Sequence, residues 1–199
     1  MRIAILGGSF NTIHVGHLVL AEEVRVKLGY DKILFIPVNL PPHKELANGA
    51  TVEDRLNMLE LAIQGNPFFE VSECEIKRGG VSYTYDTVLE MQAKFSDVLE
   101  SKIGVIMGDD LVDGFHLWHN SLELSKQADL ILARRVVCEN INIPVFSYRH
   151  IELENGVLPI SSSQIRANIS EKIGGWRYLV PDAVYKYIVK RNLYGCSTN

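Results

Sequence analysis

Residues 7–17 have the sequence Gly-Gly-Ser-Phe-Asn-Thr-Ile-His-Val-Gly-His. They follow an apolar run, Ile3–Leu6, that predicts a buried strand, and they precede an amphipathic segment, Leu18–Leu28, that predicts a helix. The backbone N–H groups of such a strand-to-helix turn attract phosphate, together with the positive end of the helix dipole. His14 and His17 lie three residues apart, so both can face that ligand from the first helical turn. The stretch therefore predicts a site that holds a nucleotide.

The two glycines alone would also suit an ordinary tight turn. Gly7 and Gly8 let a ligand approach the backbone, where Ser9 and Phe10 can offer their N–H groups. The pattern is neither Gly-x-Gly-x-x-Gly nor a phosphate loop that ends in Gly-Lys-Ser/Thr. Neither histidine lies in an apolar run, so we expect both outside the core, and no third ligand at zinc-protease spacing accompanies them. Imidazoles in this turn can instead donate hydrogen bonds to phosphoryl oxygens.

Composition limits the class of protein. The chain has 199 residues, 47% of them hydrophobic, which suits one sizeable core. The formal net charge is -4, the pI is about 5.9 and no basic stripe is evident, so no nucleic-acid partner is expected. No apolar run approaches the roughly 18 residues of a membrane span, and no signal-peptide pattern precedes the first strand. Cys74, Cys138 and Cys196 are few and far apart, which favours inert thiols in a reducing compartment. We expect a cytoplasmic protein without a membrane partner.

The rest of the chain alternates predicted strands and helices. Further strands are predicted at residues 32–37, 68–76, 103–107, 130–133 and 145–148. Helices are predicted from Thr51, from a cap at Thr84 or Asp86, from Leu111, after Asn120, after Ser161-Ser162-Ser163 and from Pro181. This alternation predicts a Rossmann-like, doubly wound α/β fold with helices on both faces of a mostly parallel sheet.

Polar segments follow several predicted strands. They are the 7–17 stretch, the loop after Pro37, Gly108-Asp109-Asp110 and Ser161-Ser162-Ser163. Ligands of open α/β sheets bind beyond the carboxyl ends of the strands, so we expect these segments to converge on one cleft. Without an internal repeat or a linker, residues 1–199 are expected to form a single domain.

Two segments together resemble a known superfamily. Residues 7–17 are similar to the first signature of the nucleotidyltransferases with an His-x-Gly-His motif, and residues 160–166, Ile-Ser-Ser-Ser-Gln-Ile-Arg, are similar to the second. Within the superfamily the chain most resembles the bacterial nicotinate-nucleotide adenylyltransferases. The matching marks cover nearly the whole chain and include Pro41-Pro42-His43-Lys44, Arg55-Leu56-Asn57-Met58-Leu59, Ser82-Tyr83-Thr84, Gly108-Asp109-Asp110-Leu111, Trp118, Tyr178-Leu179-Val180-Pro181 and Tyr187-Ile188.

The resemblance implies a reaction. The 5′-phosphate of nicotinate mononucleotide would attack the α-phosphate of ATP, releasing pyrophosphate and forming deamido-NAD in NAD biosynthesis. The nucleophile is already an anion, so positioning and electrostatics are expected to carry catalysis. Mg²⁺ is expected as the cofactor, held mainly by phosphates and water and not by a protein metal site. A C-terminal helical portion, about residues 160–195, is expected to complete the nucleotide site, and a homo-oligomer is left open.

The resemblance also implies residue roles. His14, His17 and Arg166 would be catalytic. ATP would be bound by Gly7, Gly8, Ser9, Phe10, His14, His17, Gly108, Asp110, Ser162, Ser163, Ile165 and Arg166. The acceptor nucleotide would be bound by Asn39, His43, Lys44, Thr84 and Trp118.

This chain departs from the family pattern in the first signature. The family usually has Pro at the position of Thr12 and Asp at the position of Asn11. Proline would pre-set the backbone angle, so Thr12 is expected to leave the turn less preorganised. Asn11 also accepts hydrogen bonds and suits turns. We expect an effect on loop rigidity and none on the reaction.

Several of these residues also have simpler interpretations. His43 and Lys44 could form a solvated turn, Asn39 a plain turn, Trp118 a core residue, and Thr84 and Asp110 helix caps. Arg134 and Arg135 could be a solvated pair, or one could face the adenine. His116, His119 and His150 have no motif support and are expected to be surface or structural residues.

Two alternative functions stay open at this point. A sister enzyme would transfer AMP to nicotinamide mononucleotide or to another phosphate-bearing acceptor such as phosphopantetheine. A nucleotide-binding sensor would bind without turnover. Retention of both histidines, the serine run and Arg166 argues against the sensor, because binding alone would tolerate their loss.

Overall fold

Apolar runs of the sequence form a parallel sheet in the computed structural model, which describes residues 1–42, 49–134 and 146–196. Its six strands in these ranges are β1 (Ile3–Gly8), β2 (Lys32–Pro37), β3 (Phe69–Val71), β4 (Ile103–Gly108), β5 (Ala128–Ala133) and β6 (His150–Leu153). Every pair is parallel, in the order β3-β2-β1-β4-β5-β6. The order reverses beside β1, where Ile5 pairs with both Leu34 and Val105. Ligand sites of such sheets lie at this switch point.

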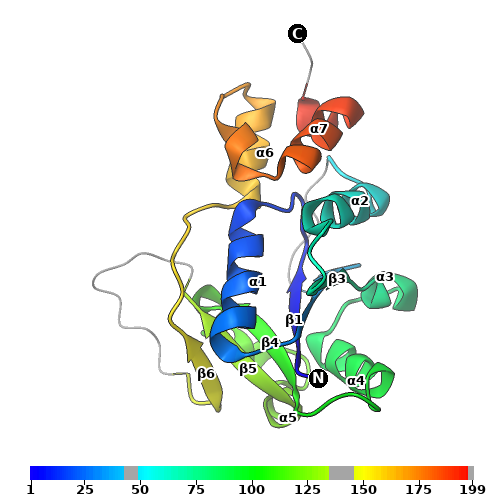
Figure 1. Ribbon diagram of the computed structural model, residues 1–199, viewed down its shortest axis with the longest axis vertical. Helices are drawn as coiled ribbons and strands as arrows, with labels where there is room; N and C mark the ends of the chain where they lie inside the picture. Colours follow the sequence, from blue (N-terminus) through cyan, green and yellow to red (C-terminus); the bar gives the residue numbers. More distant parts are fainter. Residues whose placement is uncertain (43–48, 135–145, 197–199) are drawn as a thin grey trace.

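Helices cover both faces of the sheet (Figure 1). They are α1 (Val15–Leu28), α2 (Val52–Ile63), α3 (Cys74–Arg78), α4 (Thr84–Lys94), α5 (Ser121–Gln127), α6 (Ser162–Ser170) and α7 (Asp182–Arg191). Side chains of α1, α2, α6 and α7 share one apolar cluster, and side chains of α3, α4 and α5 share the other. The predicted doubly wound fold with two covered faces is therefore confirmed.

Strand residues alternate between the two clusters. Ala4 and Leu6 of β1 face the α1 side, and Ile3 and Ile5 face the α4 side. This period of two is the geometry of a pleated strand, and burial on both faces explains the continuous apolar runs in the sequence. The same α1-side cluster contains Ile165, so the C-terminal helices pack into the core of the sheet.

Polar residues cap the N-termini of α2 and α6. Thr51 Oγ1 accepts the backbone N–H of Asp54 at 3.1 Å, and the Asp54 carboxylate accepts the N–H of Thr51 at 3.0 Å. This reciprocal pair begins α2. Ser161 Oγ accepts the N–H of Gln164 at 3.1 Å and begins α6. Both starts agree with the prediction.

Four predicted elements are wrong in detail. The strand expected over 68–76 shortens to β3, and α3 begins at Cys74, because Glu75 is drawn into a buried hydrogen bond with Thr87. The helix expected from Leu111 consists of two 3-10 turns, Asp109–Leu111 and Phe115–Leu117, with Phe115 anchored in the core.

The other two errors concern β6 and α4. A strand was predicted at 145–148, but residues 146–148 are not strand, and Val145 lies outside the described residues. Instead, β6 begins at His150, and its four residues pair with β5. Tyr83, and not Thr84 or Asp86, is the N-cap residue of α4. Asp86 lies in the first turn of that helix, where its charge suits the dipole. Asp110 lies inside the 3-10 turn Asp109–Leu111, and Gly108 is the N-cap residue of that turn.

Among the residues that the structure describes, no helix is long and apolar enough to cross a membrane.

Gly104 is packed too tightly for any other residue. A Cβ on Gly104 would lie 2.6 Å from Tyr30 Oη and 2.9 Å from Ile131 Cδ1. Gly104→Ala should therefore lower the free energy of unfolding by about 1–3 kcal/mol, through overpacking of β4. Urea unfolding followed by circular dichroism measures this change. Gly174→Ala is the control, because a Cβ there meets nothing within 4 Å. Equal stability of the two variants would contradict the packing at Gly104.

Candidate functional site

The phosphate turn, defined here as residues 7–12, leaves the carboxyl end of β1 and leads toward α1. Gly7 is exposed, and a Cβ on it would meet nothing within 4 Å. A Cβ on Gly8 would lie 3.1 Å from the ring of Phe10, which is buried. Glycine at position 8 thus lets the turn close over Phe10, while the backbone at Gly7 stays open to a ligand.

The two histidines have different surroundings. His14 is the N-cap residue of α1 and only 3% exposed, so the expectation that it lies outside the core is wrong. His17 is half-buried, and its Nδ1 accepts the backbone N–H of His14 at 3.2 Å. A neutral imidazole whose Nδ1 is an acceptor carries its proton on Nε2, so His17 presents a donor there. The two rings stack with their centroids 3.7 Å apart, so His14 fixes the plane of His17.

Residues of α6 bind directly to the phosphate turn. The Ser162 hydroxyl donates to the carbonyl oxygen of Thr12 at 2.8 Å. The Arg166 guanidinium donates to the carbonyl oxygen of Asn11 and, at 3.2 Å, to Ser163 Oγ. Two segments that are 150 residues or more apart in sequence are therefore joined by two side chains, those of Ser162 and Arg166.

These groups line one cavity of about 460 Å³, the phosphate-turn cavity. Its walls include residues 7–11 of the phosphate turn, His17, Asp110, residues 161–163 and Arg166. The sequence predicted that four polar segments converge on one cleft; three of them meet at this cavity, whereas the loop after Pro37 lines a separate cavity. Beside apolar side chains and Asp110, this wall carries an imidazole, hydroxyl groups and a guanidinium, which are donors of the kind that bind phosphate.

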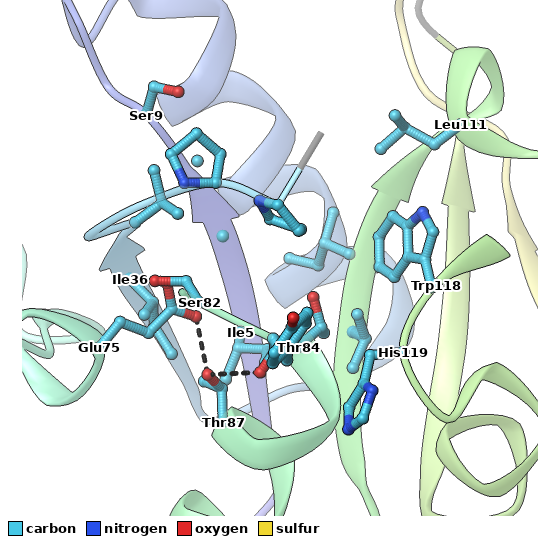
Figure 2. A pocket seen from close by; sticks show the side chains of 18 residues that line it. Ile5, Ser9, Ile36, Glu75, Ser82, Thr84, Thr87, Leu111, Trp118 and His119 are labelled. Carbon is cyan, nitrogen blue, oxygen red and sulfur yellow. Dashed lines mark hydrogen bonds between the residues drawn. The ribbon is translucent and has the colours of Figure 1, made fainter. Parts of the chain in front are cut away.

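A second cavity of about 280 Å³, the Trp118 cavity, is lined by Ile5 of β1, whereas the neighbouring Leu6 lines the phosphate-turn cavity. Figure 2 shows the Trp118 cavity. Trp118 and Leu111 form one wall, and Thr84, at the start of α4, forms another. Trp118 is half-buried, not a full core residue. Gly7, Gly8 and Ser9 line both cavities, so the two cavities meet at the phosphate turn.

Glu75 is a buried carboxyl group at the floor of the Trp118 cavity. The Thr87 hydroxyl donates to its Oε1 at 2.7 Å, and Arg78 donates to Thr87 at 2.8 Å. Burial raises the pKa of Glu75, and hydrogen bonds from Thr87 and Ser82 offset part of that rise. Ser82 Oγ also accepts the N–H of Asn39 at 2.9 Å, so this network ties the start of α4 to the loop after β2.

A third cavity of about 280 Å³ adjoins the phosphate-turn cavity and shares His17 and Asp110 with it. Arg134 and Asn155 line it. The backbone N–H of Arg134 donates to Asn155 Oδ1 at 2.8 Å. The side-chain amide of Asn155 donates to the backbone carbonyl oxygen of Arg134 at 2.9 Å. Arg134 therefore belongs to the wall of this third cavity, whereas Arg135 lies outside the described residues.

Two predicted site residues in the described part of the chain, Ile165 and Asn39, do not line these cavities. Ile165 is fully buried in the α1-side core. Asn39 donates from its side chain to the carbonyl of Gly80 at 2.8 Å and so holds a turn. His43 and Lys44 lie outside the described residues, and no cavity wall is assigned to them.

Sequence reasoning missed two lining residues. His119 was expected to be a surface or structural residue, but it lines the Trp118 cavity beside Tyr83, with ring centroids 4.4 Å apart. Glu75 was placed in a strand, and its role depends on contacts with α4 that no local pattern signals. His116 is exposed, and His150 is half-buried beside Tyr148, as expected.

Thr12, where the resemblance led us to expect a proline, is held by tertiary contacts. Its side chain is fully buried, and its hydroxyl lies 3.1 Å from the carbonyl oxygen of Ile13 and 3.2 Å from Met58 Sδ. Tyr194 Oη donates to the Asn11 side chain at 2.6 Å. Tertiary contacts therefore supply the order that a proline ring would give locally.

Comparison with known proteins agrees with this geometry. The family model described as cytidylyltransferase-like matches residues 5–168, which identifies the class of nucleotide-transferring proteins. A protein of Treponema pallidum, named "Probable nicotinate-nucleotide adenylyltransferase", is 39% identical over 98% of this chain and 99% of its own. A protein of the same name in Lactiplantibacillus plantarum is 41% identical over 97% of this chain and 88% of its own. The chain belongs to the nicotinate-nucleotide adenylyltransferase family, and the predicted resemblance is confirmed.

A solved structure shares the fold. The nicotinic acid mononucleotide adenylyltransferase of Plasmodium falciparum matches with a TM-score of 0.76 and 18% sequence identity, over 98% of each chain. At this level of identity the likeness concerns the arrangement of the sheet and its helices.

His17 can be tested separately as a donor and as part of the helix cap. In His17→Asn, the side-chain oxygen can accept the His14 N–H, but the Nε2–H donor is lost. We expect nucleotidyl transfer, measured as pyrophosphate release, to fall by about 10²–10³-fold, as for loss of one preorganised donor to a developing charge. Unfolding stability should stay close to that of the unchanged protein. His17→Ala should lose similar activity and also about 1 kcal/mol of stability with the cap. Near-normal turnover of His17→Asn would exclude His17 from catalysis.

Proposed function

We propose that this chain transfers AMP from ATP to nicotinate mononucleotide, giving deamido-NAD and pyrophosphate. A phosphate oxygen of the mononucleotide forms a bond to the α-phosphorus of ATP, and the bond from that phosphorus to the β-phosphate bridge breaks. Pyrophosphate carries away the electron pair. Since the attacking group is already an anion, the protein has to position two anions and stabilise the departing charge.

The observation that carries this proposal is the shared wall of the two main cavities. Gly7, Gly8 and Ser9 border both the phosphate-turn cavity and the Trp118 cavity. A nucleotide in each cavity would bring its phosphate to this turn. That arrangement supports a reaction between two phosphates more than simple storage of one nucleotide.

The phosphate-turn cavity suits ATP. His17 Nε2, Arg166 and the hydroxyl groups of Ser162 and Ser163 would contact the triphosphate, whose charge grows on the β-phosphate as pyrophosphate departs. His14 would act through its stack on His17. The adjoining cavity beside Arg134 and Asn155 would take the adenine side. In line with this assignment, the Plasmodium neighbour is described as complexed with APC.

The Trp118 cavity suits a pyridine ring with a carboxylate. The flat face of Trp118 can stack on the ring. No side chain in the described residues caps the first turn of α4, so the N–H groups that begin at Thr84 remain for a ligand carboxylate, which the helix dipole favours. Glu75, at the floor of this cavity, is buried, and its Oε1 accepts a hydrogen bond from the Thr87 hydroxyl at 2.7 Å. The Plasmodium protein is also described as complexed with NaAD.

Mg²⁺ is the proposed cofactor. Among the described residues, no group of three or more metal-ligating side chains is present, whereas Asp110 and the serine hydroxyl groups supply oxygen atoms at the phosphate-turn cavity. Such a wall fits an ion held mainly by phosphate oxygens and water. When bound, the ion would neutralise charge on the phosphates. Of the protein's own residues, His17 and Arg166 would orient the triphosphate.

Pyrophosphate release tests the proposed function directly. The protein is mixed with ATP and Mg²⁺, and then with nicotinate mononucleotide, nicotinamide mononucleotide or phosphopantetheine. We expect release with the acid nucleotide and formation of deamido-NAD by mass spectrometry. Faster release with the amide or with phosphopantetheine would correct the acceptor. Binding of ATP without release in any mixture would indicate a sensor.

Trp118 provides a test of the acceptor cavity. Trp118→Ala should raise the KM for the mononucleotide by about 10-fold or more, since ring stacking contributes roughly 1–3 kcal/mol per base in comparable sites. The KM for ATP should change little, because Trp118 does not line the phosphate-turn cavity. Trp118→Phe, which keeps an aromatic face, should recover part of the loss. An equal rise of both KM values in Trp118→Ala would contradict the assignment.

A further inference from the structure

Arg55 is a charged residue that is buried in the protein. It lies in α2, is 1% exposed and is the largest of the fully buried side chains in the described residues. A buried arginine is ordinarily paired with a carboxylate. Here, no carboxylate in the described part of the chain forms an ion pair with Arg55, and its Nη2 atom is buried without a hydrogen-bond partner there. The neighbouring Asp54 is bound instead to Tyr187 and Arg191.

The hydrogen bonds of Arg55 go to two loops of the site. Its Nη1 donates to the carbonyl oxygen of Ser9 at 3.0 Å and to the carbonyl oxygen of Val38 at 2.8 Å. Ser9 belongs to the phosphate turn, and Val38 begins the β2 loop, defined here as residues 38–42. One nitrogen therefore bridges the segments that leave β1 and β2 at the switch-point edge of the sheet. Figure 1 shows α2 beside this end of β1.

The two loops serve different cavities. Ser9 lines both the phosphate-turn cavity and the Trp118 cavity. Val38, together with Pro41 and Pro42, lines the Trp118 cavity only. A shift of one loop relative to the other would therefore change the distance between the ligands of the two cavities.

Burial of this cation is costly. Burial lowers the pKa of Arg55, yet a guanidinium stays charged in proteins, so its desolvation is only partly offset by two carbonyl oxygens. An apolar side chain of similar length would fill the same space without that cost. The stability of the fold therefore does not explain why an arginine occupies this position. Its hydrogen bonds to the backbone of Ser9 and Val38 do, because they hold two segments together.

We propose that Arg55 is a positioning residue that sets the spacing between the phosphate turn and the β2 loop, and so aligns the two reacting phosphates. This inference rests on the proposed function. Arg55 does not line the cavities described above and acts through the backbone of Ser9 and Val38. Reaction rates depend steeply on such alignment, since a misplacement of about 1 Å can cost roughly 10²-fold.

The test compares Arg55→Met, Arg55→Lys and the control Thr51→Ala. Thr51 caps the same helix and touches neither loop by hydrogen bond, so its variant loses stability without loss of the bridge. All proteins are assayed below the temperature at which any of them unfolds. Amide hydrogen exchange of residues 7–12 and 36–42 is measured by mass spectrometry, alongside kcat and both KM values.

We expect faster exchange in both segments of Arg55→Met and a fall in kcat of about 100-fold with a rise of both KM values. Arg55→Lys, whose single ammonium can reach one carbonyl, should be intermediate. Thr51→Ala should keep the exchange and the kinetics of the unchanged protein. If Arg55→Met does not fold, Arg55→Lys decides the question by the same measurements.

Unchanged exchange in either segment, or a change in the KM of one substrate alone, would overturn the inference. Equal kinetic effects in Thr51→Ala would also overturn it, because they would indicate general destabilisation. If the unchanged protein releases no pyrophosphate at all, the proposed function fails, and the exchange measurement still decides whether Arg55 bridges the two loops.

Discussion

The site depends on the hydrogen bonds that close α6 onto the phosphate turn. The carbonyl oxygens of Asn11 and Thr12 accept from Arg166 and Ser162, which lie at the other end of the chain. Each bond satisfies a backbone acceptor and at the same time fixes a donor side chain on the cavity wall. The closure therefore orders the turn and assembles the phosphate-binding donors in one step. Without it, neither segment alone would surround a triphosphate.

The sheet and the helices packed on it determine where α6 meets the phosphate turn. Parallel strands bring the turn after β1 and the segment after β4 to the same edge, and the helices that pack on the α1-side cluster hold α6 against that edge. Ile165 points into this core while Arg166, its neighbour, lines the cavity. Burial of Ile165 fixes the rotation of α6 and so turns Arg166 toward the cavity. Packing of the core therefore also positions this guanidinium.

Much of the site could be predicted because its signals are local. The apolar run before Gly7 and the serine cap at Ser161 each define an element within a few residues, and both are found as expected. What could not be predicted depends on tertiary contacts. The ring of His14 stacks on His17, and His119 reaches the Trp118 cavity after a 3-10 turn that begins at the buried Phe115. Glu75 is helical because α4 binds it.

The most direct test is a crystal structure of the protein with Mg²⁺ and a non-hydrolysable ATP analogue. The account predicts that the triphosphate lies in the phosphate-turn cavity, with phosphate oxygens within hydrogen-bond distance of both His17 Nε2 and the Arg166 guanidinium. A triphosphate that contacts the turn of residues 7–12 alone, with residues 162–166 pointing elsewhere, would contradict it.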